Sequence, residues 1–110
     1  MKIDKSLLSG STTMLILRLL EAQDMYGYQM IEMLDRQSNN IFTLKAGTLY
    51  PILHALEKQG MVESYDEPEP ENARPRKYYA ITKSGAKLLQ AKKEEWELYS
   101  GAVNLVMGGV

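Results

Sequence analysis

The 110-residue sequence contains no cysteine, one histidine and one tryptophan. Without cysteine, the chain has no disulfide bond, no thiolate metal ligand and no cysteine nucleophile. The single histidine, His54, leaves too few nitrogen ligands for a zinc site of the usual kind. We therefore predict that the protein has no metal centre.

Glycine-rich loops that cradle phosphate groups are also missing, and no two carboxylates stand in a recognisable pocket motif. These absences predict a protein that is not an enzyme and holds no cofactor. The chain has 14 acidic and 13 basic residues, a net charge of −1, and so has no bulk attraction to nucleic acid. Any contact with DNA must come from basic side chains that cluster locally.

No stretch of the sequence approaches the ~20 apolar residues that a membrane-spanning helix requires. The N-terminus, MKIDKSLLSGST, carries charges but lacks the apolar segment and the small-residue cleavage site of a signal peptide. We expect a cytoplasmic protein with no membrane partner.

The segment around which the chain is organised is residues 46–60, AGTLYPILHALEKQG. Its apolar residues recur at i, i+3, i+4 and i+7, which places them on one stripe of an α-helix that faces the core. The opposite side carries Pro51, His54 and Lys58 and is free to meet a partner. The apolar stripe consists of Leu49, Ile52, Leu53 and Leu56.

Pro51 leaves the start of this helix open, because proline fits the first turn but clashes with the carbonyl four residues earlier when it lies deeper. The helix begins near Gly47 or Thr48, or it begins near Lys45 and bends at Pro51. Both alternatives place residues 45–50 at the N-terminal end, where free N–H groups and the helix dipole favour an anion such as phosphate.

The hydrophobic pattern predicts two helices before this segment and two strands after it. Residues 11–22 are apolar almost all round and predict a central buried helix, and residues 26–38 predict an amphipathic one. Residues 61–65 and 77–82 alternate as antiparallel strands do. The prolines and acids between these strands predict a long hairpin tip outside the sheet, because proline interrupts sheet pairing.

A last helix is predicted over residues 83–107, with Thr82 as its N-cap. Its apolar residues step by three and four alternately, which is the spacing of a heptad seam. A stripe this broad is too apolar to remain in water, and Leu7 and Leu8 upstream of the first helix predict an extra turn that packs against a neighbour. The seam residues are Leu89, Trp96, Tyr99, Val103 and Val106, interrupted by Lys92.

This order of elements predicts a fold that is mainly α with a two-stranded β-ribbon. It is the order of a winged helix-turn-helix with a long C-terminal helical extension. Residues 1–82 would form the DNA-binding domain, with the wing at about 61–82, and residues 83–107 the last helix. The helix over 46–60 would then enter the major groove of double-stranded DNA.

Four blocks of sequence carry a resemblance to a known family: YGYQMIEML at 26–34, GTLYPILHALEKQGMVES at 47–64, RPRKYYAITKSGAKLL at 74–89 and EEW at 94–96. Together they resemble the PadR family of bacterial transcriptional regulators, in its compact, short-chain branch. The resemblance implies a homodimer joined through the last helix, so that residues 83–107 form a C-terminal dimerisation helix with Leu7, Leu8 and the seam residues at the interface. It also implies that the dimer usually represses a promoter, and we expect its operator to be near-palindromic. It also implies that a small effector often releases the repressor.

The sequence departs from the family pattern in two places. Lys45-Ala46 stands where many relatives have Ser-Pro. The run DEPEPE at 66–71 makes half of the wing acidic, which opposes contact between the wing and phosphates.

The residues that the resemblance places at DNA lie on the second helix, the third helix and the wing. They are Tyr26 or Tyr28 at the start of the second helix, Thr48, Tyr50 and His54 of the third, and the basic residues of the wing. The local cationic set consists of Lys45, Lys58, Arg74, Arg76 and Lys77. The alternative is that these charges are solvated, with those of the wing paired to its acids. For Tyr50 the alternative is a ring that packs on the preceding helix while only its hydroxyl reaches outward.

Trp96 permits two interpretations. On a dimer seam it would be repeated by symmetry and would form an aromatic slot for a planar aromatic or phenolic small molecule. The other interpretation, which we favour, makes Trp96 and Tyr99 part of the interface core. For the whole chain the alternative to a DNA-binding repressor is a winged-helix protein-interaction module that binds no DNA and offers its acidic wing to a protein.

Overall fold

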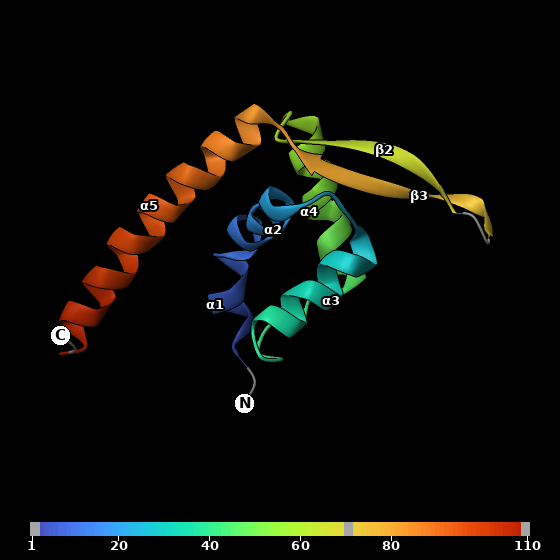
Figure 1. The fold of residues 1–110 in the computed structure, drawn as a ribbon. Coiled ribbons are helices and arrows are strands. Elements are labelled where there is room, and N and C mark those ends of the chain that lie inside the picture. Colours follow the sequence, from blue (N-terminus) through green and yellow to red (C-terminus); the bar gives the residue numbers. More distant parts are fainter. Residues whose placement is uncertain (1–2, 70–71, 109–110) are drawn as a thin grey trace.

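The computed structural model describes residues 3–69 and 72–108, without the side chains of residues 69 and 72–74. Helices and a small sheet alternate along the chain, and Figure 1 shows their arrangement. The elements are α1 (Lys5–Ser9), α2 (Thr12–Ala22), β1 (Met25–Tyr26), α3 (Gly27–Gln37), α4 (Ala46–Lys58), β2 (Val62–Glu69), β3 (Asn72–Ile81) and α5 (Lys83–Val106).

The core forms where α2, α3, α4 and the sheet meet. Helix α2 contributes Ile16 and Leu17, which are completely buried, and this confirms the prediction of a central buried helix. Helix α4 buries Leu49 and Leu53 on the stripe that the spacing predicted. Tyr79 of β3 closes the core from the side of the sheet.

The sheet has three strands in the order β1-β3-β2, and all neighbouring strands are antiparallel. The prediction of two strands missed β1, in which Met25 pairs with Tyr79 and Tyr26 pairs with Tyr78. A strand of two residues is too short to show an alternating pattern, so its existence depends on β3, more than 50 positions later.

The prediction of a long hairpin tip is wrong, because β2 continues to Glu69 and β3 begins at Asn72. Strand β2 lies at the edge of the sheet, where a proline can leave its nitrogen outside the hydrogen-bonded ladder. Pro68 coincides with an irregularity in the register between Glu67 and Glu69. Pro68 therefore coincides with a local irregularity without ending β2, which continues to Glu69.

Helix α4 begins at Ala46, so Pro51 lies inside the helix and not in its first turn. This start agrees with the alternative of a beginning near Lys45. The carbonyl that loses its helical partner because of Pro51 belongs to Gly47. Apart from the neighbouring residues and the backbone of α4 itself, no described atom lies within 4 Å of the position where a Cβ of Gly47 would stand.

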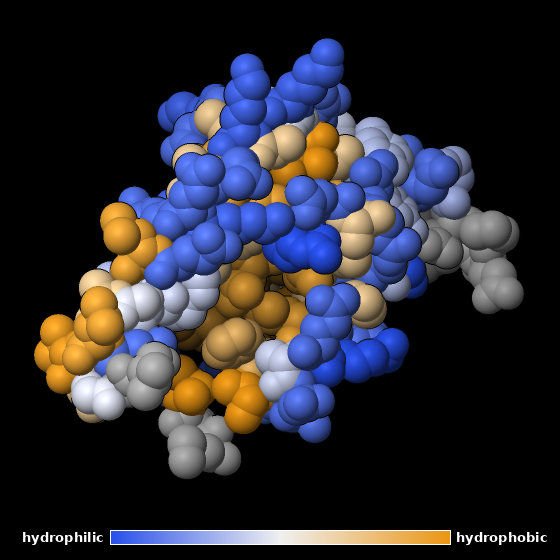
Figure 2. Space-filling view, turned by 60° about the vertical axis from the view of Figure 1, so that its left-hand side comes forward, coloured by the Kyte–Doolittle hydropathy of each residue, from blue (hydrophilic) through white to orange (hydrophobic). Residues whose placement is uncertain are grey.

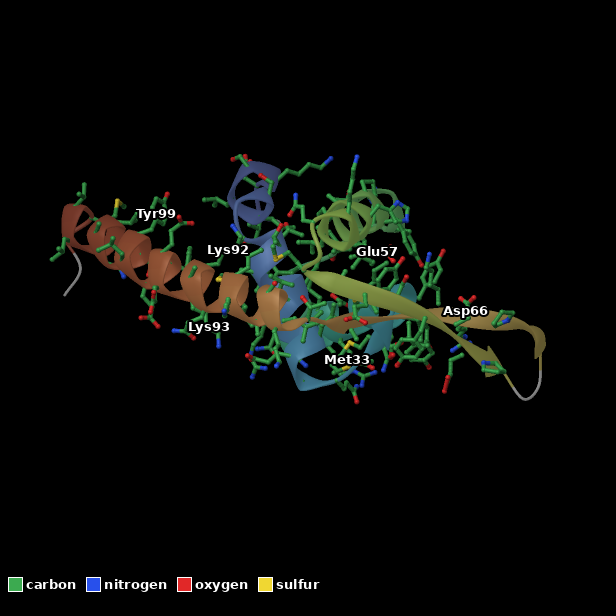
Figure 3. The ribbon with its side chains drawn as sticks, turned by 90° about the horizontal axis from the view of Figure 1, so that it is seen from above. Met33, Glu57, Asp66, Lys92, Lys93 and Tyr99 are labelled. Atoms are coloured by element: carbon green, nitrogen blue, oxygen red, sulfur yellow. The ribbon has the colours of Figure 1, made fainter. Side chains whose placement is uncertain are left out.

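Helix α5 is anchored at its first turn. The Thr82 hydroxyl accepts a hydrogen bond from the Gly85 N–H (3.0 Å) and donates to the Gly60 carbonyl (2.7 Å), which confirms Thr82 as the N-cap. From this root α5 leaves on the side opposite to the ribbon of β2 and β3, as Figures 1 and 3 show. The molecule is accordingly elongated, with extents of 56 × 32 × 21 Å. Over the described ranges, no helix has the length and apolar character needed to cross a bilayer.

Candidate nucleic-acid interface

The outward side of α4 is exposed and carries basic and polar side chains. Lys45, Thr48, His54 and Lys58 are all exposed, while the opposite stripe of the helix is buried. Glu57 is the only acid between residues 45 and 60, and its carboxylate accepts a hydrogen bond from the Ser64 hydroxyl on β2. This acid is therefore tied to the sheet, and the outward side of α4 presents positive charge.

The start of α4 is open to an anion. The carbonyl of its N-cap residue, Lys45, accepts hydrogen bonds from the N–H groups of Thr48 (3.0 Å) and Leu49 (2.9 Å). No side chain among the described residues caps the helix start. The first N–H groups and the positive end of the helix dipole can therefore attract phosphate.

Tyr50 lies against the start of α3. A Cβ added to Gly27 would stand 2.2 Å from the Tyr50 hydroxyl oxygen, so only glycine leaves room for the phenol head there. Burial raises the pKa of Tyr50, and the nearby Tyr28 adds to the effect. The ring packs on the preceding helix as the alternative predicted, but the hydroxyl points to Gly27 and not outward. Tyr28 is 66% exposed and is the tyrosine of this pair that a partner can reach.

Tyr26 lies on strand β1 and not in the helix where the sequence placed it. Its ring meets the ring of Tyr78 edge to face, with centroids 5.4 Å apart. The guanidinium carbon of Arg76 lies 4.3 Å from the centroid of the Tyr26 ring. Tyr26 is thus half-buried by its neighbours within the chain.

The basic residues of the wing stand opposite acids. In the register of β2 and β3, Arg76 pairs with Glu67 and Lys77 pairs with Asp66. Arg76 and Lys77 are both exposed, and as successive residues of a strand they point to opposite faces of the ribbon. Arg74 belongs to β3, but its side chain lies outside the described residues. Acids therefore offset the charge of the wing, unlike that of α4.

Most of the predicted seam is exposed in the single chain. Trp96 is 48% exposed, Tyr99, Val103 and Val106 are exposed as well, and so is Leu7 of α1, whereas Leu8 is half-buried. Leu89 is 1% exposed, and the structure corrects its assignment. The first turns of α5 pack against α2 and the sheet, so Leu89 belongs to the core of its own subunit.

An apolar groove separates the distal part of α5 from α1 and α2. Its cavity volume is about 760 Å³, and Figure 2 shows it as a hollow lined by hydrophobic side chains. Lys92 and Tyr99 lie on the side of α5 that faces this groove, and Lys93 lies on the other side (Figure 3). The sequence did not single out Met14 and Phe42, which line the groove with Leu7, Leu8, Trp96 and Val103.

The chain resembles known transcriptional regulators in sequence and in fold. The sequence profile of the transcriptional regulator PadR-like family matches residues 16–91. A transcriptional regulator from Clostridium thermocellum has a similar structure, with a TM-score of 0.83 and 34% identity over 90% of this chain and 95% of its own. A PadR family transcriptional regulator from Eggerthella lenta superposes with a TM-score of 0.81 and 30% identity, over 93% of this chain and 86% of its own.

A curated relative gives the same indication at lower identity. Transcriptional regulator YqjI from Escherichia coli is 27% identical over 89 residues, which are 81% of this chain and 41% of YqjI. The matched part of YqjI is thus less than half of that protein. The relatives that carry a functional name are regulators and not enzymes, in agreement with the absence of catalytic motifs.

Proposed function

The chain belongs to the transcriptional regulator PadR-like family, and on that premise we propose that it is a homodimeric repressor that binds a near-palindromic operator. DNA-binding regulation follows from family membership. The repressor role, the dimer and the residues that read DNA are our proposal. The observation that carries it is the exposed basic side of α4, which is held in place by the buried Leu49, Leu53 and Leu56 on the opposite side.

We assign the DNA contacts by chemistry and exposure. Lys45 and Lys58 bind phosphates at the two ends of α4, while Thr48 and His54 face the base edges of the major groove. Tyr28 adds a contact from the start of α3. Of the wing, Arg74, Arg76 and Lys77 contact the flanking backbone, against the opposition of the neighbouring acids.

The second part of the proposal is the dimer. Residues 1–82 read the DNA, and residues 83–107 join two subunits through the exposed apolar residues of α5. A twofold axis between two α5 helices would present two copies of α4 to half-sites about one helical turn, ~34–36 Å, apart. This geometry requires an operator whose halves are related by the same symmetry.

The groove beside Trp96 is the proposed effector site. Its volume of about 760 Å³ and its apolar lining suit a planar aromatic or phenolic molecule. Because Trp96 and Tyr99 also stand on the proposed interface, an effector there would change how the two subunits meet. The spacing of the two α4 helices, and with it the affinity for the operator, would change in turn.

The acidic residues of the wing suggested the alternative, a protein-interaction module that binds no DNA. Asp66 and Glu67 do face the basic residues of β3 in register, so they offset the charge of the wing. They leave α4 unaffected, and family membership favours DNA as the partner.

A gel-shift titration over a range of salt concentrations tests the proposal. The probes are the DNA upstream of the protein's own gene and a random duplex of equal length and base composition. We expect the upstream region to bind at least ~1000-fold more tightly at physiological salt, the lower end for specific regulators. Equal affinity for both probes at every salt concentration would defeat the claim of a sequence-specific repressor.

Two pairs of variants test the division of roles. Lys45→Ala and Arg76→Ala should weaken binding to both probes, because each removes a phosphate contact. Thr48→Ala and His54→Ala should act mainly on the operator, with ~1–3 kcal/mol of discrimination lost at particular base pairs. A uniform loss in all four variants would show that this division is wrong.

A further inference from the structure

The outer face of the sheet carries a row of three tyrosines, one from each strand. Tyr78 of β3 stands in the middle, with Tyr26 of β1 edge to face at 5.4 Å and Tyr65 of β2 stacked at 5.8 Å, measured between ring centroids. The Tyr65 hydroxyl donates a hydrogen bond of 2.7 Å to the Asp24 carboxylate, just before β1. The row therefore ties all three strands together on the side away from the core.

Arg76 lies at one end of this row. Its guanidinium carbon is 4.3 Å from the centroid of the Tyr26 ring, a distance at which a cation is attracted to the ring face. Glu67 is its cross-strand neighbour in register, so an acid of the wing also lies within reach. The Tyr26 ring is not the only group that interacts with Arg76, and this ring belongs to β1, on the opposite side of β3 from Glu67.

The position of Tyr26 connects this charge to the DNA-binding helices. Tyr26 is followed directly by Gly27, the first residue of α3, and Gly27 packs against Tyr50 of α4. A guanidinium held over Tyr26 therefore stands at the root of the wing, beside the junction of α3 and α4. A guanidinium drawn to Glu67 would turn toward β2, and the two charges would offset each other.

We propose that Tyr26 is a positioning residue that holds the Arg76 guanidinium at the root of the wing, where it binds a DNA phosphate together with α4. The inference rests on the proposed function, because it assigns a task within the same DNA interface. It replaces the expectation that Tyr26 contacts DNA itself. The ring face performs the task, so the hydroxyl of Tyr26 is dispensable.

The salt dependence of duplex binding separates positioning from stability. Each phosphate that a protein neutralises contributes about 0.9 to the slope of log affinity against log salt concentration. Arg76→Ala should lower that slope by about 0.9. Tyr26→Val keeps a residue that suits a strand but removes the ring, and it should lower the slope in the same direction and the affinity roughly two- to fivefold. Tyr26→Phe should match the unchanged protein.

Three further measurements complete the test. In the double variant with Tyr26→Val and Arg76→Ala, the slope should equal that of Arg76→Ala alone, because the ring acts only through the guanidinium. Tyr65, at the other end of the row, loses its hydrogen bond to Asp24 in Tyr65→Phe, and this variant should leave the slope unchanged. Arg76→Lys keeps the charge without the flat guanidinium, and should lose affinity while Tyr26 and the fold stay intact.

The outcomes that contradict the inference are distinct. Equal losses in Tyr26→Phe and Tyr26→Val would assign the effect to a hydroxyl contact. A lower melting temperature in Tyr26→Val with an unchanged slope would leave Tyr26 only a structural role. Unchanged binding by Arg76→Lys would show that the Tyr26 ring does not hold the charge. If the unchanged protein binds neither probe at low salt, the proposed function itself fails.

Discussion

The winged-helix part of the chain and the distal half of α5 differ in how far their apolar side chains are buried. In the first, Leu53 is completely buried, and the exposed Tyr65 donates its hydroxyl hydrogen bond to Asp24 of the same chain. In the second, Leu98 and Leu105 are 79% and 77% exposed, and Trp96 is half exposed. The winged-helix part is complete as a single chain, whereas the distal half of α5 lacks a surface to pack against.

This difference separates the part that folds as a single chain from the part that would pack against a second copy in the proposed dimer. Burying one large apolar side chain stabilises by roughly 1.5–3 kcal/mol, and the distal half of α5 leaves several such side chains in water. A second copy of the chain would cover them. The comparison therefore predicts that changes in the two regions affect different measurements, folding in one and association in the other.

The largest effect is expected for Trp96→Asp. A twofold interface loses the same side chain twice and gains two charges, so association should weaken by at least ~3–6 kcal/mol. Sedimentation velocity should find monomers or aggregates, while Gln90→Asp, the same new residue on another face of α5, should remain dimeric. A dimer that survives Trp96→Asp would refute the seam, and Val103→Asp repeats the test about two helical turns further from the root.

The next largest difference is expected between two leucines, one in each region, in the free energy of unfolding. Leu53→Ala removes a completely buried side chain from the core and should cost about 2–5 kcal/mol in the free energy of unfolding. Leu98→Ala, in a helix position that is 79% exposed, should change the unfolding of the monomer by less than ~0.5 kcal/mol. Urea unfolding of both variants in the monomeric Trp96→Asp background measures this. Similar losses would show that α5 packs within the chain more fully than its exposure indicates.

Substitutions at two glycines of α5 should have smaller effects on stability, and the two effects should have opposite signs. A Cβ on Gly85 would stand 2.1 Å from the Met61 carbonyl oxygen, so Gly85→Ala must displace backbone and should cost about 1–3 kcal/mol. At Gly101, no described atom outside the neighbouring residues and the local helix backbone lies within 4 Å of the same position, so Gly101→Ala should stabilise the helix by up to ~1 kcal/mol. Thermal unfolding of the monomeric background distinguishes the two. A loss at Gly101 would contradict the free helix surface that we describe.

The sequence predicted the helices closely because each repeats its apolar spacing over several turns. Helices α2, α3, α4 and α5 all begin and end within two residues of the predicted bounds. The same reasoning failed where a contact between distant residues decides the structure. Strand β1 exists because Met25 and Tyr26 pair with β3, and nothing within two residues announces that pairing.

The same distinction applies to the predicted site, where local spacing could be read from the sequence but contacts between distant residues could not. Exposure of Lys45, Thr48 and His54 follows from the helical spacing of α4 and could be predicted. The environments of Tyr26 and Tyr50 could not, because Arg76 is far from Tyr26 in the sequence and Gly27 is far from Tyr50. Leu89 shows a further limit, since a heptad pattern says that a side chain is buried but not whether its own subunit or a partner buries it.

The smallest effect concerns Tyr65, an exposed aromatic residue whose hydroxyl forms a hydrogen bond within the winged-helix part. The hydrogen bond to Asp24 is the main cause that raises the pKa of Tyr65 from its ordinary 10.0 to about 12. Because the folded state keeps this proton while the unfolded chain loses it, the contribution to stability is present below pH 10 and disappears as the pH rises toward 12. Absorbance of phenolate during an alkaline titration, compared with Tyr65→Phe, should locate the transition. Asp24→Asn should return the pKa of Tyr65 toward 10.0 without changing the oligomeric state, and a shift in association would mean that the sheet also belongs to the interface.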